Sequence, residues 1–340
     1  MIRSLVFLAA LVTPLAVLDG PSTAQSHRTQ ASSSHTLSLT GYAPEQPRFA
    51  SGVDLVSLDV CVRDSTGRLL TGLTPDDFLV LENGTPQRIS FVMPSGAVPL
   101  AAMLLIDVSG SMYGPKLERA IEAARQFAEL LGPEDRLEII AFNQRAERLH
   151  AFSDDRAHVP SALSSSIGTT LSSSRGTTGS TALYDALLVG ANELLRARGG
   201  TLPDTREVVI VLSDGEDTSS RMGFDEVLPA LRRSGALMYS VSLRADDRGG
   251  WLGASWPLLQ LARDTGARAL GVPDLDALPA LYAEIDAEVR HLYRIGYVSS
   301  DERRDGQWRD VSVRVLSRDA QVRTRAGYYP SRQRTTGDQP

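Results

Sequence analysis

The sequence predicts an α/β fold: a doubly wound, mostly parallel sheet inserted between flanking strands that form a small β-sandwich. Through the middle of the chain, compact apolar runs alternate with helical patterns, which is typical of parallel strands covered by helices on both faces. Segments with period-two hydrophobicity precede and follow this region. A hydrophobic content of 42% and a charged content of 22% fit a globular protein of 340 residues.

The first 24 residues have the pattern of a cleaved secretion signal. Arg3 precedes an apolar run from Leu5 to Leu18, and Ser22-Thr23-Ala24 supplies small residues for a signal peptidase. We therefore expect cleavage after Ala24 and a secreted or periplasmic protein. An uncleaved anchor is the alternative, but the run is short and interrupted, and no later stretch predicts a stable membrane span. Residues 25–51 are rich in Ser, Thr, Gln and Pro and predict a flexible leader.

Residues 52–96 predict the N-terminal part of the β-module. Apolar and polar side chains alternate from Val56 to Val62, as in a half-buried strand. Asn83-Gly84 is a strong hairpin signal between the apolar segments Phe78–Leu81 and Ile89–Val92.

Residues 97–289 predict the α/β domain. Its four apolar runs are expected to be parallel strands: Leu100–Ile106, Leu137–Phe142, Val208–Leu212 and Leu237–Val241. The clearest helix begins at Pro115, carries an apolar stripe from Leu117 to Leu131, and stops at Gly132-Pro133. Three more segments have helical spacing: residues 182–198, 224–233 and 275–289.

Residues 290–329 predict the C-terminal part of the β-module, followed by a polar tail over residues 330–340. Alternation returns at Tyr293–Tyr297 and Val311–Val315, and a last strand is expected at Gln321–Ala326. The economical arrangement is that both flanks pair with each other and carry the α/β domain between them.

Charge and cysteine usage narrow the function classes. The formal net charge is −6, which gives no reason to expect nucleic-acid binding, because such binding would call for a basic face. Cys61 is the only cysteine, so an intrachain disulfide is impossible, and its strand pattern predicts a small packed residue. Lys116 is the only lysine among 35 basic residues, which we interpret as a coding bias without mechanistic content.

Oxygen-bearing side chains follow the predicted core strands. Asp107, Ser109 and Ser111 come after the first strand, Thr181 opens the helix at 182, and Asp214 follows the strand at Val208–Leu212. Loops at the carboxyl ends of parallel strands converge, and ligands bind there. A set of oxygens without His or Cys suits Mg²⁺, with Mn²⁺ or Ca²⁺ also accepted.

These five residues resemble the metal-ion-dependent adhesion site of von Willebrand factor type A domains, Asp-x-Ser-x-Ser followed by a distant Thr and a distant Asp. The resemblance covers about residues 98–287, and the flanks resemble a secreted bacterial family usually called VWFA-related. It implies a Rossmann-like fold, direct binding of Mg²⁺ by the hydroxyls, and an Asp or Glu carboxylate of a protein partner completing the octahedron. The loops 161–181 and 214–224 are then expected to shape specificity.

Simpler interpretations exist for single residues. Ser111 and Thr181 are also suited to helix starts, and Asp185 to packing near one. Glu216 and Asp217 fit either a second ion or a solvated acidic turn, and Trp251 with Trp256 fits either a binding patch or hydrophobic cover.

The sequence predicts a binding module and not an enzyme. The five histidines show neither metal-ligand spacing nor a triad base, and no nucleophile elbow or P-loop is present. Two alternatives stay open: a metal-dependent hydrolase, and a structural or assembly subunit that uses the domain as a metal-independent scaffold. The oligomeric state is not predicted.

Overall fold

The computed structural model describes residues 55–93, 96, 98–164, 180–198, 204–243, 256–272, 274–316 and 319–330. The expected signal sequence, the leader and residues 331–340 of the tail lie outside this part of the chain, as do Trp251 and most of the 161–181 loop. The described residues belong to one compact unit. Among the described residues, no helix has both the length and the apolar character needed to cross a bilayer.

A six-stranded sheet forms the centre of the α/β region, in the order β10-β9-β8-β5-β6-β7. The four predicted runs are its parallel strands, β5 (Leu100–Asp107), β6 (Arg136–Phe142), β8 (Arg206–Ser213) and β9 (Leu237–Ser242). Two strands were not predicted: β10 (Ala269–Gly271) extends the sheet in parallel, and β7 (Ala146–Ser153) forms an antiparallel edge beside β6. The mostly parallel α/β fold is thus confirmed.

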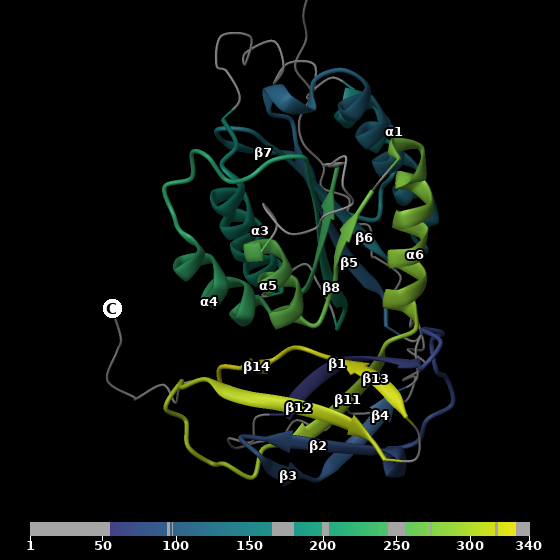
Figure 1. Ribbon diagram of the computed structural model, residues 1–340, viewed down its shortest axis with the longest axis vertical. Coiled ribbons are helices and arrows are strands. Elements are labelled where there is room, and N and C mark those ends of the chain that lie inside the picture. The colour runs from purple at the N-terminus through teal and green to yellow at the C-terminus, as the bar shows by residue number, and fades with distance from the viewer. Residues whose placement is uncertain are drawn as a thin grey trace, which may run out of the picture. The chain divides into compact units, whose positions relative to one another are not determined.

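Helices cover both faces of this sheet (Figure 1). One face carries α1 (Pro115–Leu130) and α6 (Leu278–Arg290), and the other carries α3 (Leu183–Arg198), α4 (Phe224–Ser234) and α5 (Trp256–Thr265). The helix expected at 275–289 begins with a 3₁₀ turn, Leu275–Ala277, and α5 was not predicted. Residues 159–164 are also helical.

β5 is buried on both sides, which explains its unbroken apolar sequence. Ala102, Leu104 and Ile106 belong to the core beneath α1 and α6, whereas Met103 and Leu105 belong to the core beneath α3. The helix α3 lies very close to the strand, because a Cβ atom added at Gly190 would be 2.8 Å from the Met103 sulfur. Burial on both faces fixes β5 firmly, and its carboxyl end positions the site described below.

Two four-stranded sheets are built from the flanking segments, with the orders β13-β1-β11-β4 and β14-β12-β2-β3. Strands before and after the α/β region pair directly: β1 (Leu55–Asp64) with β11 (Tyr293–Val298), and β2 (Phe78–Glu82) with β12 (Arg309–Val315), both antiparallel. The remaining strands are β3 (Thr85–Gln87), β4 (Ile89–Met93), β13 (Ala320–Arg323) and β14 (Gly327–Tyr328). Residues of both sheets share one hydrophobic cluster. Cys61 is buried in β1 and unpaired.

The hairpin predicted between Phe78–Leu81 and Ile89–Val92 is wrong in its second strand. Asn83 and Gly84 do form a two-residue turn with positive φ, 48° and 80°, but the turn joins β2 to β3. A two-residue turn fixes the register so that Glu82 faces Thr85 and Val80 faces Gln87. After Gln87 the chain leaves this ladder, and β4 pairs with β11 in the other sheet.

Buried ion pairs connect the flanking strands to the α/β region. The Arg206 side chain on β8 donates to the Asp59 carboxylate of β1 at 3.0 Å and to the Leu292 carbonyl at 3.0 Å. Burial opposes ionisation of Asp59, but the guanidinium groups of Arg206 and Arg294 lower its pKa. A second buried carboxylate, Glu288 of α6, accepts hydrogen bonds from four side chains: Tyr239, Arg268, Arg63 of β1 and Arg323 of β13.

Candidate metal centre

The five predicted ligands lie where the loops after β5 and β8 meet the segment before α3. Asp107 is the last residue of β5, and Asp214 directly follows β8, which pairs with β5. Thr181 precedes α3, and the next residue, Ala182, donates its N–H to the carbonyl of Asn143, which follows β6. The site is therefore at the carboxyl edge of the sheet, where ligands of open α/β sheets bind.

The loop after β5 is held by a buried carboxylate. Asp107 accepts the backbone N–H of Ser109 at 2.8 Å through one oxygen and the Ser213 hydroxyl at 2.5 Å through the other. A 3₁₀ turn, Gly110–Met112, then brings the chain to α1, and the buried Met112 side chain anchors it. The side chains of Ser109 and Ser111 are thereby fixed on the same side of the loop, with their hydroxyl oxygens 3.1 Å apart.

A hydrogen bond connects this loop with the segment after β8, and Thr181 lies beside that segment. The Ser111 hydroxyl donates to one oxygen of Asp214 at 2.7 Å. The Thr181 hydroxyl points toward the segment after β8, because a Cβ atom added at Gly215 would lie 3.8 Å from it. Asp107, Ser109, Thr181 and Asp214 are buried, while Ser111 is exposed. The structure brings all five residues together at one point that opens to the surface through Ser111.

The donor set fits a small divalent cation. Oxygens at roughly 2.0–2.1 Å from Mg²⁺ in an octahedron are about 2.9 Å from their neighbours. The two oxygen pairs that the structure shows, Ser109 with Ser111 at 3.1 Å and Ser111 with Asp214 at 2.7 Å, are close to that spacing. Small shifts of the side chains are therefore enough to place these oxygens around one ion.

Charge is arranged asymmetrically around the two carboxylates. Burial raises the pKa of Asp107, and hydrogen bonds from Ser213 and Ser109 oppose that shift. The second oxygen of Asp214 forms an ion pair with the ammonium group of Lys116, the second residue of α1. Burying the charged Asp107 carboxylate without a cation nearby costs free energy, so the site favours a bound positive charge.

Three supporting residues were not identified from the sequence. Ser213 orients Asp107, and Lys116 pairs with Asp214. Thr218 accepts the N–H of Thr181 at 2.8 Å with its hydroxyl and returns its own N–H to the Thr181 carbonyl at 2.9 Å. Ser213 and Thr218 lie in the same "LSDGEDTSS" segment as Asp214, which is the one sequence signal for them.

Asp185 and Asp217 lie near the site but have other roles than the five candidate ligands. Asp185 accepts the backbone N–H groups of Arg221 and Met222 at 3.1–3.2 Å, which supports the packing interpretation. Asp217 accepts the N–H of Tyr184 at the start of α3. Within the described part of the chain, no cluster of three or more His, Cys, Asp or Glu side chains is arranged to hold a metal, and the candidate site instead combines two carboxylates with hydroxyls.

Residues 102–216 match the von Willebrand factor type A domain family, and this range contains all five candidate ligands. The chain therefore contains a von Willebrand factor A domain. It is 28% identical over 187 residues to inter-alpha-trypsin inhibitor heavy chain H4 of Sus scrofa, which is 54% of this chain and 18% of that protein. It is 30% identical over 134 residues to heavy chain H2 of Homo sapiens, 38% of this chain and 14% of that protein. The chain thus spans less than a fifth of these relatives.

Among solved structures, the chain is similar to the conserved hypothetical protein BatB from Bacteroides thetaiotaomicron. The sequence identity is 18%, and the match covers 56% of this chain and 98% of that one with a TM-score of 0.43.

Proposed function

We propose that this chain is an exported protein-binding module whose von Willebrand factor A domain captures an acidic side chain of a partner through Mg²⁺. The ion would be held by five residues: Asp107, Ser109, Ser111, Thr181 and Asp214. The observation that carries the proposal is the convergence of three hydroxyls and two carboxylates at one surface point, with oxygen spacings of 2.7 and 3.1 Å. Mn²⁺ or Ca²⁺ would also be accepted in vitro because oxygen ligands select only modestly among these ions.

Each part of the site has a distinct task in this mechanism. The hydroxyls supply neutral ligands, so that Asp107 and Asp214 are the only anionic members of the donor set. Mg²⁺ bound there would supply a Lewis-acidic coordination position for one further oxygen, and an Asp or Glu carboxylate is the protein group that would match it best. Ser213 holds Asp107 in its orientation through the 2.5 Å hydrogen bond, as supporting groups around metal ligands do.

Tyr113 is suited to contact the partner beside the ion. It lies two residues after Ser111 in the turn before α1, and its side chain is 68% exposed. A large aromatic side chain at the rim of a binding site contributes contact area at little entropic cost. The loops 161–181 and 214–224 would supply further specificity.

The remaining parts of the chain have supporting roles in the proposal. Residues 1–24 would direct export, and residues 25–51 would form a flexible leader before the module. Residues 52–96 and 290–329 would form a β-sandwich that carries the A domain of residues 97–289. The antiparallel pairing of β1 with β11 and of β2 with β12 supports this arrangement.

A metal-dependent hydrolase is less well supported. Such an enzyme needs a general base beside the metal-bound water. The three described histidines have other surroundings: His158 pairs with Asp155, His291 contacts the Ala287 carbonyl, and the His150 Nε2 atom has no partner among the described residues. If the domain were a metal-independent scaffold, the convergence of five oxygen donors would have no function.

Selection of a displayed random-peptide library on the immobilised full chain tests the proposal. Binding in Mg²⁺ and elution with EDTA should enrich peptides that share one Asp or Glu, and replacing that residue by Asn or Gln should abolish their binding. The Asp107→Ala variant should capture none of them. Enrichment of peptides without a common acidic residue, or equal binding in EDTA, would contradict carboxylate capture through a metal.

A further inference from the structure

The only lysine of the chain lies at the candidate metal centre. Lys116 is in the first turn of α1, and its ammonium group pairs with one carboxylate oxygen of Asp214. The other Asp214 oxygen accepts the Ser111 hydroxyl at 2.7 Å. The Lys116 side chain is 37% exposed while that of Asp214 is 2% exposed, so a partly exposed cation pairs with a buried carboxylate.

Lys116 adds a positive charge to a site whose five candidate ligands supply only negative charge. Asp107 and Asp214 together carry two negative charges when ionised, which a divalent ion would neutralise. With Lys116 beside Asp214, the same site carries one negative charge without the ion and one positive charge with it. Two consequences follow: the ammonium group repels the incoming ion, and the loaded site attracts an anion.

We propose that Lys116 couples metal binding to carboxylate binding at this site. This inference rests on the proposed function. In the metal-free chain the ammonium group neutralises Asp214 and lowers the affinity for Mg²⁺. When the ion engages Asp214, Lys116 is released, and its N–H groups donate to the second oxygen of the carboxylate that binds the ion. Metal and carboxylate therefore bind more tightly together than either does alone, a reciprocal coupling between two ligands.

The first test compares Mg²⁺ affinity in chloride buffer and in excess acetate by calorimetry, with acetate as the carboxylate probe. A monovalent and a divalent cation a few ångströms apart repel enough to change an affinity about tenfold or more, even in a well-hydrated site. Lys116→Met should therefore lower the Kd for Mg²⁺ in chloride about tenfold or more. Acetate should lower the Kd of the parent chain and have much less effect on Lys116→Met.

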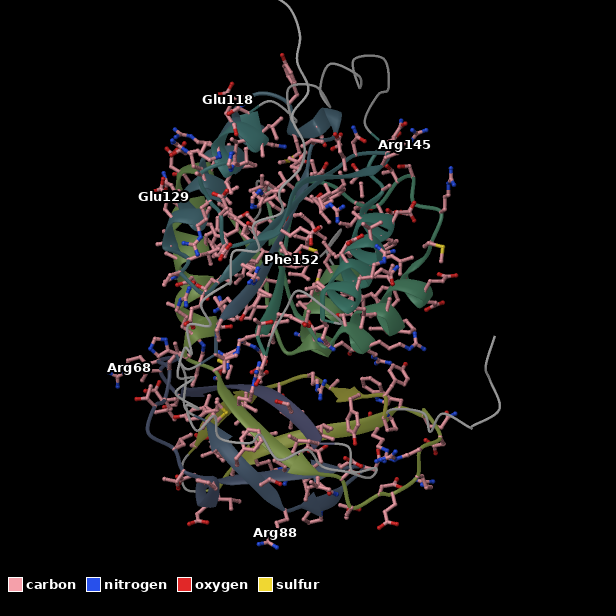
Figure 2. All side chains as sticks on the ribbon, turned by 180° about the vertical axis from the view of Figure 1, so that it is seen from behind. Arg68, Arg88, Glu118, Glu129, Arg145 and Phe152 are labelled. Carbon is pink, nitrogen blue, oxygen red and sulfur yellow. The ribbon has the colours of Figure 1, made fainter. Side chains whose placement is uncertain are left out.

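Two control variants separate this effect from a general change in charge. Lys116→Arg retains the positive charge and should behave like the parent. Arg145 follows β6 and is exposed, and Figure 2 shows it at the same end of the central sheet as Glu118 in the first turn of α1. Arg145→Gln removes one positive charge at that end without touching Asp214, and its Kd values should match those of the parent.

The possible failures are distinguishable. If the parent binds Mg²⁺ and Lys116→Met binds it with equal or lower affinity, or if acetate helps both equally, the coupling role is overturned while the metal site stands. If neither the parent nor Lys116→Met binds Mg²⁺ in either buffer, or if Asp107→Ala binds it normally, the proposed function itself fails and the inference fails with it.

A single lysine also permits a direct measurement. Selective ¹⁵N labelling of lysine gives one side-chain ammonium signal. In the parent this signal should move when Mg²⁺ and acetate are added together, and in Asp107→Ala it should stay unchanged. An unchanged signal in a parent sample saturated with Mg²⁺ would show that Lys116 does not leave Asp214, contrary to the proposal.

Discussion

Replacing Glu138 by glutamine should stabilise the protein at alkaline pH. Glu138 lies in β6 with its side chain 1% exposed, and one of its carboxylate oxygens has no hydrogen-bond partner among the described residues. Its nearest cation is the half-exposed Arg148 at 3.9 Å, which also pairs with Glu193. Burial first, and the charge of Glu193 second, raise the pKa of Glu138 to about 7.

The size and sign of the effect follow from linkage. An unfolded Glu138 loses its proton near its ordinary pKa of 4.5, whereas the folded one retains it to about pH 7. Between these values the folded state binds more protons, so the free energy of unfolding falls as the pH rises. At 1.36 kcal/mol for each pKa unit, ionised Glu138 costs about 3 kcal/mol above pH 7. Glutamine imitates the protonated form at every pH and avoids this cost.

Urea unfolding of the parent and of Glu138→Gln, followed by circular dichroism, measures the difference. The variant should gain about 2–3 kcal/mol at about pH 8 and almost nothing at about pH 4. Glu82→Gln is the matched control, because the Glu82 carboxylate is equally buried but accepts hydrogen bonds from Tyr297, Tyr328 and Arg309. It should destabilise the protein. An equal gain for Glu138→Gln at both pH values, or none at pH 8, would refute the reasoning.

Three further predictions concern the site and its support. Ser213→Ala removes the hydroxyl that orients Asp107 and should weaken Mg²⁺ binding about tenfold in calorimetry; unchanged affinity would rule out that role. Tyr113→Ala should reduce capture of selected peptides while leaving Mg²⁺ affinity unaltered, and equal loss of both would place Tyr113 in the metal site instead of at its rim. Arg206→Met removes the closest cation of Asp59 but leaves Arg294 paired with it, and should lower the free energy of unfolding by about 1.5–3 kcal/mol, measured in urea; an unchanged free energy of unfolding would contradict a structural role for this pair.

The predicted strands of the central sheet were recognisable because each is buried on both faces. Runs such as that in β5 contain almost nothing but apolar residues, and no tertiary information is needed to find them. The edge strand β7 was missed because its side chains are half-buried or exposed and include charged residues. The segment is a strand because it pairs with β6, and the local sequence does not encode that pairing.

The candidate ligands could be predicted from the sequence, whereas the residues that support them could not. Asp107, Ser109 and Ser111 lie within five residues, and their spacing alone brings the oxygens onto one loop. The hydrogen bond from Ser213 to Asp107 and the ion pair from Lys116 to Asp214 join residues 106 and 98 positions apart. These contacts depend on which side chains the ends of β5 and β8 and the start of α1 direct toward one another, and the local sequence pattern does not specify that.

Calorimetric titration of Mg²⁺ into the full chain and into Asp107→Ala tests the central claim most directly. Matching melting temperatures of the two proteins in EDTA would establish that the variant is folded. The account predicts a single binding event in the parent and none in the variant. Equal binding by both proteins, or no binding by the parent with or without acetate, would contradict a metal centre built on Asp107.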